Sequence, residues 1–208
     1  ARGAVADTML CDVTDRPAMA GWIAACESRA PLDLLIANAG LGGVAALAHG
    51  ACESAATTER LFAVNLMGVV HGVTPLLPLM LRRGSGQIAI IGSLAGMHGL
   101  PQSPGYSASK AAVAAYGDAL RRQAAPLGVK VAVVWPGFVE TPMSRDIPYR
   151  HLFLWRAERA AGHIARRLAR GDGQIAFPWP MVILARLGRL LPWRWADALL
   201  IRAARTGA

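Results

Sequence analysis

The stretch Tyr106-Ser107-Ala108-Ser109-Lys110 opens an alanine-rich run, residues 108–125, that predicts a helix. Residues four apart share a helix face, so the Tyr106 phenol and the Lys110 ammonium should point the same way from one rigid element. A nearby cation favours the phenolate, so we expect the pKa of Tyr106 to fall from about 10 toward the working pH, as a tyrosine general acid or base requires. In most helices such a pair is only a surface pair, so the residues around it decide the interpretation.

Two polar residues upstream stand where a site on a parallel sheet would need them. Ser93 follows the apolar strand pattern of residues 87–91, and Asn65 lies inside a long helical pattern over residues 57–81. Taken alone, the serine is more often a cap or turn residue, and the asparagine a tolerated polar residue that faces a neighbour. The order and spacing of these residues before Tyr106 reverse that preference.

Together these pieces resemble the short-chain dehydrogenase/reductase family. The matching motifs spread over residues 12–143 and are Asp12-Val13-Thr14-Asp15, Asn38-Ala39-Gly40, Asn65, Ser93, Tyr106 with Lys110, Pro136-Gly137 and Thr141-Pro142-Met143. The resemblance implies one α/β domain with a Rossmann-like, doubly wound parallel sheet. It also implies reversible hydride transfer between NAD or NADP and an alcohol, ketone or aldehyde. NAD and NADP are not distinguished, because the deciding residues would follow a second strand that this sequence does not contain.

The resemblance assigns a role to each candidate catalytic residue. Tyr106 exchanges a proton with the substrate oxygen, and Ser93 holds that oxygen. Lys110 lowers the pKa of Tyr106 and binds the nicotinamide ribose. Asn65 opens its helix and holds a water that continues the proton relay.

By the same resemblance, residues at the ends of two strands bind the adenosine half of the cofactor. The Asp12 carboxylate accepts from the adenine amino group, and the backbone of Val13 helps. Asn38, Ala39 and Gly40 follow an apolar strand at residues 33–37, where small residues let the backbone approach a ribose. The simpler interpretations are a helix N-cap for Asp12 and an ordinary turn for residues 38–40.

The resemblance implies that the segment after a strand at residues 129–134 binds the nicotinamide half. By resemblance, Pro136 and Gly137 bracket the nicotinamide together with Val139, whose backbone bonds the carboxamide, while Thr141 bonds it by its side chain. An ordinary turn is the alternative for Pro136-Gly137.

The start of the chain predicts a strand at Val5–Cys11, which fits the third strand of the doubly wound order, and residues 33–37 fit the fourth. The family's glycine-rich loop and first two strands have no counterpart here. We therefore expect a sheet that is incomplete at its N-terminal part, with either a gap or a non-native pairing between residues 5–11 and 33–37, and weak dinucleotide binding. The alternative function is a catalytically inactive relative that acts only as an interaction partner. The coding region upstream of Ala1 would distinguish these.

The remaining pattern predicts a helix over residues 17–29, capped by Asp15 or Thr14, and a last strand at residues 174–177. Further helices are predicted over residues 158–170, 181–191 and 195–204. The apolar segment 142–156 predicts a substrate lid and favours a lipophilic substrate. His98, in a glycine- and proline-rich loop, is a candidate second proton donor, although an exposed loop histidine is the simpler interpretation. By resemblance, homo-oligomers would form through the helices at residues 57–81 and 108–125.

Composition limits the classes of function. Of the 208 residues, 54% are apolar, which favours a folded core, and no apolar run reaches the roughly 20 residues of a membrane span. Three cysteines without metal-ligand spacing favour a reduced, cytoplasmic protein with no metal.

The net charge of +9 is concentrated at the C-terminal end. Residues 150–208 contain 11 arginines and 3 acidic residues, whereas the preceding residues are almost balanced. A solvated helical face is the favoured explanation; the alternative is an anionic partner, namely a cofactor phosphate, an acyl carrier or a membrane surface. Nucleic acid fits poorly, because no nucleic-acid-binding motif is present.

Overall fold

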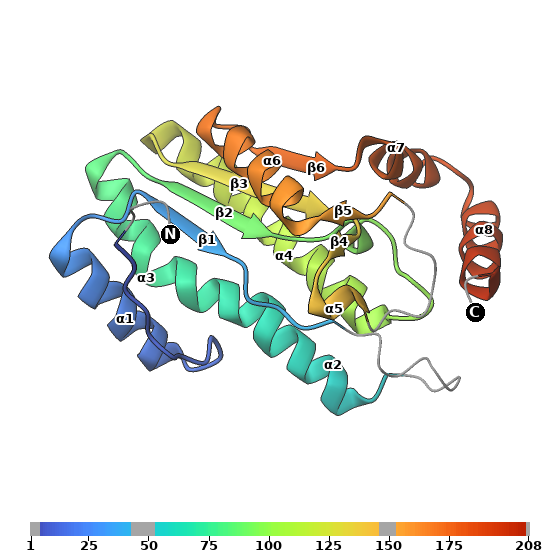
Figure 1. Ribbon diagram of the computed structural model, residues 1–208, viewed down its shortest axis with the longest axis horizontal. Coiled ribbons are helices and arrows are strands. Elements are labelled where there is room, and N and C mark those ends of the chain that lie inside the picture. The colour runs from blue at the N-terminus through green and yellow to red at the C-terminus, as the bar shows by residue number, and fades with distance from the viewer. Residues whose placement is uncertain (1–4, 43–52, 146–152, 207–208) are drawn as a thin grey trace.

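Four parallel strands form the central sheet of the computed structural model, which describes residues 5–42, 53–145 and 153–206 (Figure 1). They are β1 (Leu34–Ala37), β2 (Gln87–Ile91), β3 (Lys130–Pro136) and β6 (Gln174–Phe177), adjacent in the order β1-β2-β3-β6. β2 and β3 are almost wholly buried, which is why they read as continuous apolar runs. The predicted strands at 87–91 and 174–177 are confirmed to the residue.

Helices cover both faces of the sheet, as a doubly wound fold requires (Figure 1). On one face, α1 (Arg16–Arg29), α3 (Gly68–Arg83) and α4 (Pro104–Ala124) pack on Ile88 and Ile90 of β2. On the other face, α6 (Ala157–Ala169) packs on Ala89 of the same strand. Successive side chains of β2 therefore point into two separate apolar cores, one on each face of the sheet. The expected α/β Rossmann-like class is confirmed.

The long helix predicted over residues 57–81 is one continuous helical rod that contains a π-helical turn. It consists of α2 (Ala55–Phe62), the π-helical turn η2 (Ala63–Met67) and α3. Among the described residues, this rod is the one helical stretch long and apolar enough to cross a membrane. Its apolar side chains Val73, Leu76 and Met80 are fully buried, so it is the core helix of the fold.

The strand predicted at Val5–Cys11 is wrong. Residues 5–12 form no β-ladder, and the side chains of Val5 and Leu10 are fully exposed. A strand exists only with a hydrogen-bonded neighbour, and β1, with Leu34 and Ile36 exposed, is itself the edge of the described sheet. Of the two expected arrangements, a non-native pairing of residues 5–11 with 33–37 is therefore not seen.

The described elements after β2 lie close to their predicted places. The turn η3 (Leu94–Gly96) precedes α4, η4 (Ala125–Leu127) follows α4, and β6 leads to α7 (Trp179–Gly188) and α8 (Trp193–Thr206). Two features were not predicted: a small parallel pair, β4 (Val139–Glu140) with β5 (Trp155–Arg156), and the short helix α5 (Pro142–Arg145). Most of the predicted lid, residues 146–152, lies outside the described residues. Cys11 and Cys26 are free thiols, and Cys52 also lies outside the described part.

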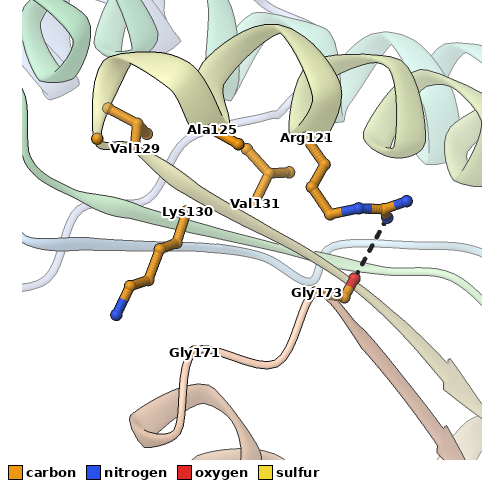
Figure 2. Close-up of a pocket in the computed structure, with 8 residues that line it drawn as sticks. Arg121, Ala125, Val129, Lys130, Val131, Gly171 and Gly173 are labelled. Carbon is orange, nitrogen blue, oxygen red and sulfur yellow. Dashed lines mark hydrogen bonds between the residues drawn. The ribbon is translucent and has the colours of Figure 1, made fainter.

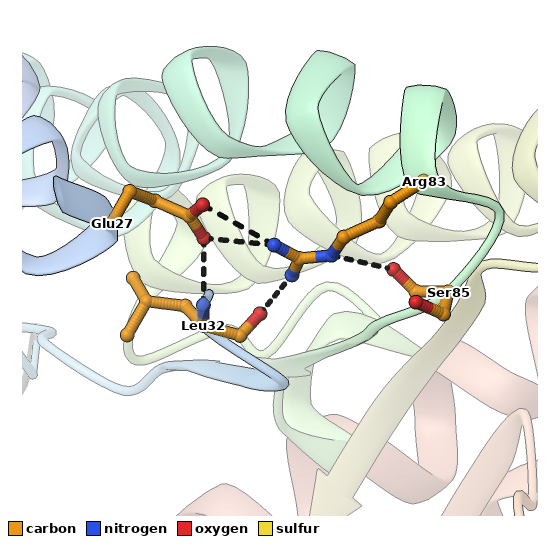
Figure 3. Close-up of polar contacts among 4 residues, drawn as sticks. All are labelled: Glu27, Leu32, Arg83 and Ser85. Atoms are coloured by element: carbon orange, nitrogen blue, oxygen red, sulfur yellow. Dashed lines mark hydrogen bonds and ion pairs between the residues drawn. The ribbon is translucent and has the colours of Figure 1, made fainter. Parts of the chain in front are cut away.

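A polar cluster at the amino ends of the strands joins α1 to α3 (Figure 3). The Arg83 guanidinium donates to both carboxylate oxygens of Glu27 at 3.2 Å, to the Leu32 carbonyl, and through Nε to the Ser85 carbonyl at 3.1 Å. Glu27 also accepts from the Leu32 amide at 2.7 Å. One largely buried ion pair thus fixes the chain where it enters β1 and β2.

We expect Arg83→Met to lower the free energy of unfolding by about 2 kcal/mol, because it leaves the Glu27 carboxylate partly buried without its cation. Urea denaturation measures the effect. Arg82→Met is the matched control, since Arg82 is exposed on the same helical turn, and it should change stability little. Equal losses in the two variants would contradict the role given to the cluster.

Candidate active site

Tyr106 and Ser93 meet at the carboxyl end of β2. Tyr106 lies in the first turn of α4, which begins at Pro104, and Ser93 follows β2 directly. The Ser93 hydroxyl is hydrogen-bonded to the Tyr106 phenol. The Ser93 Oγ also accepts from the Ala95 amide at 3.1 Å, which orients the side chain. The structure therefore brings together two residues that the sequence separates by thirteen positions.

The predicted fall in the pKa of Tyr106 is wrong for this structure. Burial raises the pKa of Tyr106, and the bond from Ser93 opposes that rise only in part. The Lys110 Nζ does lie on the same side, 6.0 Å from the centre of the Tyr106 ring. At neutral pH the phenol is therefore protonated, ready to act as an acid.

Lys110 is buried against the sheet. Its Nζ donates to the Ile91 carbonyl at 2.9 Å, and burial lowers the pKa of Lys110 to about 8. The ammonium is thus still mostly charged at neutral pH, although it is costly to hold in this position. A lysine in this state can act on a neighbouring hydroxyl as a cation and give up its proton within the physiological range.

Asn65 lies at the centre of the π-helical turn η2, so the predicted opening of the helix at this residue is confirmed. Its Oδ1 accepts from the Leu41 amide at 2.7 Å, and its Nδ2 donates to the Leu41 carbonyl at 3.1 Å and to the Ser109 Oγ at 3.0 Å. The side chain thereby joins the segment after β1 to the second turn of α4. The π-helical turn provides the local widening that functional sites often use.

Two glycines allow the segments of the site to approach each other. A Cβ on Gly40 would lie 3.1 Å from the Asn65 Oδ1 and 3.4 Å from the Lys110 Nζ. A Cβ on Gly96 would lie 2.8 to 2.9 Å from backbone atoms of Lys110 and Ala111, which cannot move aside. Gly96 therefore lets η3 pack directly on α4, and that contact holds Ser93 beside Tyr106.

A cavity of about 530 Å³ lies between the segment after residue 10 and the end of β1. Four of the predicted cofactor residues line it: Asp12, Val13, Ala39 and Gly40. Asn38, the remaining residue predicted for the adenosine half, follows β1 with an exposed side chain and does not line this cavity.

Asp12 is oriented by a turn and does not cap the helix. Its Oδ1 accepts from the Thr14 amide and hydroxyl, both at 2.9 Å, and these bonds lower the pKa of Asp12. Asp15 caps α1, with its Oδ1 accepting from the Ala18 amide at 3.0 Å. The carboxylate of Asp12 is therefore fixed, charged and exposed beside the cavity.

The residues predicted for the nicotinamide end lie at the carboxyl end of β3. Pro136 is the last residue of β3, and the Gly137 amide donates to the Phe177 carbonyl at 2.7 Å. A Cβ on Gly137 would lie 3.4 Å from Leu94 Cδ1, so this turn is next to η3. Val139 follows in β4, and the Thr141 Oγ1 accepts from the Ser144 amide at 3.3 Å.

A second cavity, of about 310 Å³, lies at the other end of the sheet, where β3 and β6 begin (Figure 2). Arg121 and Lys130 line it, but Arg121 pairs with Asp118 and donates to the Gly173 carbonyl at 3.4 Å. In open α/β sheets, ligands bind beyond the carboxyl ends of the strands. The first cavity, with the residues around Tyr106, is therefore the candidate active site.

Comparison with known families agrees with this geometry: the model of the short chain dehydrogenases matches residues 1–151. The chain belongs to the short-chain dehydrogenase family. An uncharacterised oxidoreductase of Myxococcus xanthus is 31% identical over 199 residues, which are 95% of this chain and 78% of that protein. A ketoacyl reductase of Nostoc is 40% identical over 117 residues, 56% of this chain and 40% of that protein.

Among solved structures, a short-chain dehydrogenase from Burkholderia cenocepacia in complex with NADP superposes with a TM-score of 0.76. It is 26% identical, and the match covers 94% of this chain and 79% of that one. The match extends beyond β3 to nearly the whole chain.

Sequence reasoning missed two residues of the site. Ser109 is fully buried, accepts from Asn65 and donates to the Tyr106 carbonyl at 2.8 Å. Its position three residues after Tyr106 was the available signal, since such residues share a helix face. Arg60 lines the larger cavity and acts electrostatically on Asp12; it lies five residues before Asn65 on the same rod.

Proposed function

We propose that this short-chain dehydrogenase is an NAD- or NADP-dependent oxidoreductase that interconverts an alcohol and a ketone or aldehyde, with Tyr106 as the general acid and base. The observation that carries the proposal is the Tyr106 phenol, bonded by Ser93 and sharing its helix face with the buried ammonium of Lys110. A protonated phenol near the carboxyl end of β2, with a fixed hydroxyl beside it, can bind and protonate a carbonyl oxygen.

The described residues fit a dinucleotide. The larger cavity is edged by the exposed Asp12 carboxylate, an acceptor suited to an adenine amino group, and by the small residues Ala39 and Gly40. Lys110 would bind the nicotinamide ribose, and Pro136, Gly137, Val139 and Thr141 would hold the carboxamide end. When bound, the nicotinamide supplies or accepts the hydride.

The chain's own residues handle the proton. In reduction, the Tyr106 phenol donates its proton to the carbonyl oxygen, while Ser93 holds that oxygen and the Lys110 ammonium stabilises the phenolate that remains. The phenolate then regains a proton from the Lys110 ammonium, and Lys110 would be reprotonated through a water held by Asn65, whose side chain is fixed between Leu41 and Ser109. Because burial keeps the pKa of Tyr106 high, we infer that reduction is favoured near neutral pH and oxidation at alkaline pH.

The substrate is proposed to be lipophilic. The described ends of the lid expose Met143, Phe153 and Leu154, apolar side chains suited to cover an apolar ligand. The alternative, an inactive interaction partner, has less support, because the four candidate catalytic residues are all present and Ser93 bonds Tyr106. Assembly through the helices at 57–81 and 108–125 stays a prediction.

The direct test follows the oxidation of NADH and NADPH with a panel of aliphatic, aromatic and polar ketones. We expect turnover with one of the two cofactors, supplied at a concentration high enough to offset the weak dinucleotide binding that the sequence predicts, and a preference for the apolar ketones. Binding of either cofactor without oxidation in the presence of any ketone or aldehyde would contradict the proposal.

We expect Ser93→Ala to reduce kcat about 100-fold or more, because it removes a fixed hydrogen bond to the substrate oxygen. It should also raise the pKa of Tyr106 further, so that oxidation needs a more alkaline pH than in the wild type. The pH profile of kcat measures both effects. Ser85→Ala, an exposed serine before β2, is the control; a Ser93→Ala enzyme with an unchanged pH profile would contradict the bond to Tyr106.

A further inference from the structure

The helices α7 and α8 expose more apolar surface than a solvated helical face explains. In α7, Trp179, Ile183 and Leu187 are spaced by four, share one face and are all exposed, with Trp179 at 72%. In α8, Trp193 and Trp195 are 69% and 68% exposed. Leu190, between the two helices, is 80% exposed. An ordinary surface helix turns such a stripe toward the core, so these side chains lack the cover that they would find in a folded domain.

The two helices lie beyond the carboxyl ends of the strands, with α8 standing away from the sheet (Figure 1). They follow β6, at the opposite side of the sheet from the β1 edge, so a strand added beside β1 would not reach them. Such a strand would therefore leave the exposed side chains of α7 and α8 uncovered.

α7 is firmly joined to the candidate active site. His98, predicted as an exposed loop residue or a proton donor, bonds the Ala185 carbonyl of α7 through its Nε2 at 2.6 Å. Val182 is buried, and the Met181 Sδ would lie 3.0 Å from a Cβ on Gly137. The outer face of α7 therefore has a fixed position relative to the loops after β2 and β3.

The charge on these helices is predominantly positive. Residues 179–208 contain five arginines and one aspartate, a net charge of +4. The Arg194 guanidinium lies 5.2 Å from the centre of the Trp193 ring, so a cation and an aromatic ring sit side by side at the start of α8. Arginine, tryptophan and leucine on exposed amphipathic helices are the composition of segments that lie in a membrane interface.

We propose that the α7–α8 face, defined by Trp179, Ile183, Leu187, Trp193 and Trp195 with Arg186, Arg189 and Arg194, binds the surface of a membrane that contains anionic lipids. A second copy of the chain would bring like charges together, which opposes self-association through this face. A protein partner must match the shape of the face, whereas a bilayer interface accepts protruding tryptophans in any arrangement. Anionic headgroups match the arginines in charge, and the acyl boundary accepts the apolar side chains.

Docking in this way would bring the loops that hold Ser93 and Gly137 toward the lipid surface, because α7 contacts both loops. A lipophilic substrate could then reach the site from the membrane. The membrane proposal itself does not depend on hydride transfer, and its test uses no activity.

The test is sedimentation of the purified chain with vesicles of phosphatidylcholine alone and of phosphatidylcholine mixed with phosphatidylglycerol. We expect binding to the anionic vesicles and weaker binding at high salt, because the Debye length falls from about 10 Å at 0.1 M to about 3 Å at 1 M. Arg189→Gln with Arg194→Gln should weaken partition about 25-fold, about fivefold for each arginine. Trp193→Ser with Trp195→Ser should weaken it at least about tenfold.

The matched control is Leu127→Ser with Arg82→Gln, an exposed apolar residue and an exposed arginine near the amino ends of the strands. All substituted side chains are exposed, so circular dichroism should show the same fold in every variant. Failure of the monodisperse wild type to sediment, or an equal loss in the control, would overturn the proposal. It would also be overturned if the tryptophan variant dissolved an oligomer, or if the face bound an acidic protein, while vesicles were not bound.

Discussion

Tyr106→Phe should abolish nearly all turnover while the cofactor still binds. The substitution removes one oxygen and leaves the ring, so the first turn of α4 should pack as before. Positioned proton transfer contributes about 10² to 10⁴ in rate, and more where no other acid can replace the missing one. Among the described side chains, Ser93 is the group bonded to that phenol, and its hydroxyl is a far weaker acid.

Steady-state kinetics with the best ketone, together with a cofactor titration, measure this prediction. Tyr116→Phe is the matched control, because Tyr116 is another partly buried tyrosine of α4, with a pKa also raised by burial. The control should keep close to the wild-type rate. Substantial activity in Tyr106→Phe would show that another group is the acid.

Lys110→Met should lower both kcat and cofactor affinity, because one ammonium serves the phenolate and the ribose. Any remaining activity should need a higher pH, since no cation then stabilises the phenolate. Lys130→Met is the matched control, because Lys130 is the only other lysine of the chain and is exposed. It should leave kcat and cofactor affinity unchanged. Unchanged cofactor affinity in Lys110→Met would disprove the ribose contact.

The same substitution should make the fold more stable. Burial lowers the pKa of Lys110 from 10.5 to about 8, so between these values the unfolded chain binds more protons than the folded one, and stability rises with pH. Below pH 8 the wild type carries the full cost of the buried charge. Lys110→Met removes that cost and loses the bond to Ile91, so we expect a net gain of about 2 kcal/mol near neutral pH.

Urea denaturation of the wild type and Lys110→Met across pH 7 to 11 measures this gain. The difference should shrink as the pH rises through the window of about 8 to 10.5. A constant difference over that range would mean that the buried charge is not its cause. A stability gain with an activity loss is the expected pattern for a residue kept for chemistry.

Local sequence patterns predict most of the elements that form the sheet and carry the site. Residues 87–91 and 174–177 are apolar runs because the strands are covered on both faces, and this pattern is local. Asp15 was one of two predicted caps of α1, because a carboxylate three residues before an amide is a local arrangement. The four-residue spacing of Tyr106 and Lys110 likewise fixes a shared helix face.

Other properties depend on contacts between segments that are distant in the sequence. Residues 5–11 alternate like a strand, yet a strand depends on a neighbour that local pattern does not supply. The direction of the pKa shift of Tyr106 follows from burial by distant segments, which outweighs the hydrogen bond with Ser93. Whether the apolar side chains of α7 and α8 are covered also depends on the position of these helices after β6. Local backbone geometry depends on neighbouring residues in the sequence, whereas the burial of a side chain depends on every segment that packs around it.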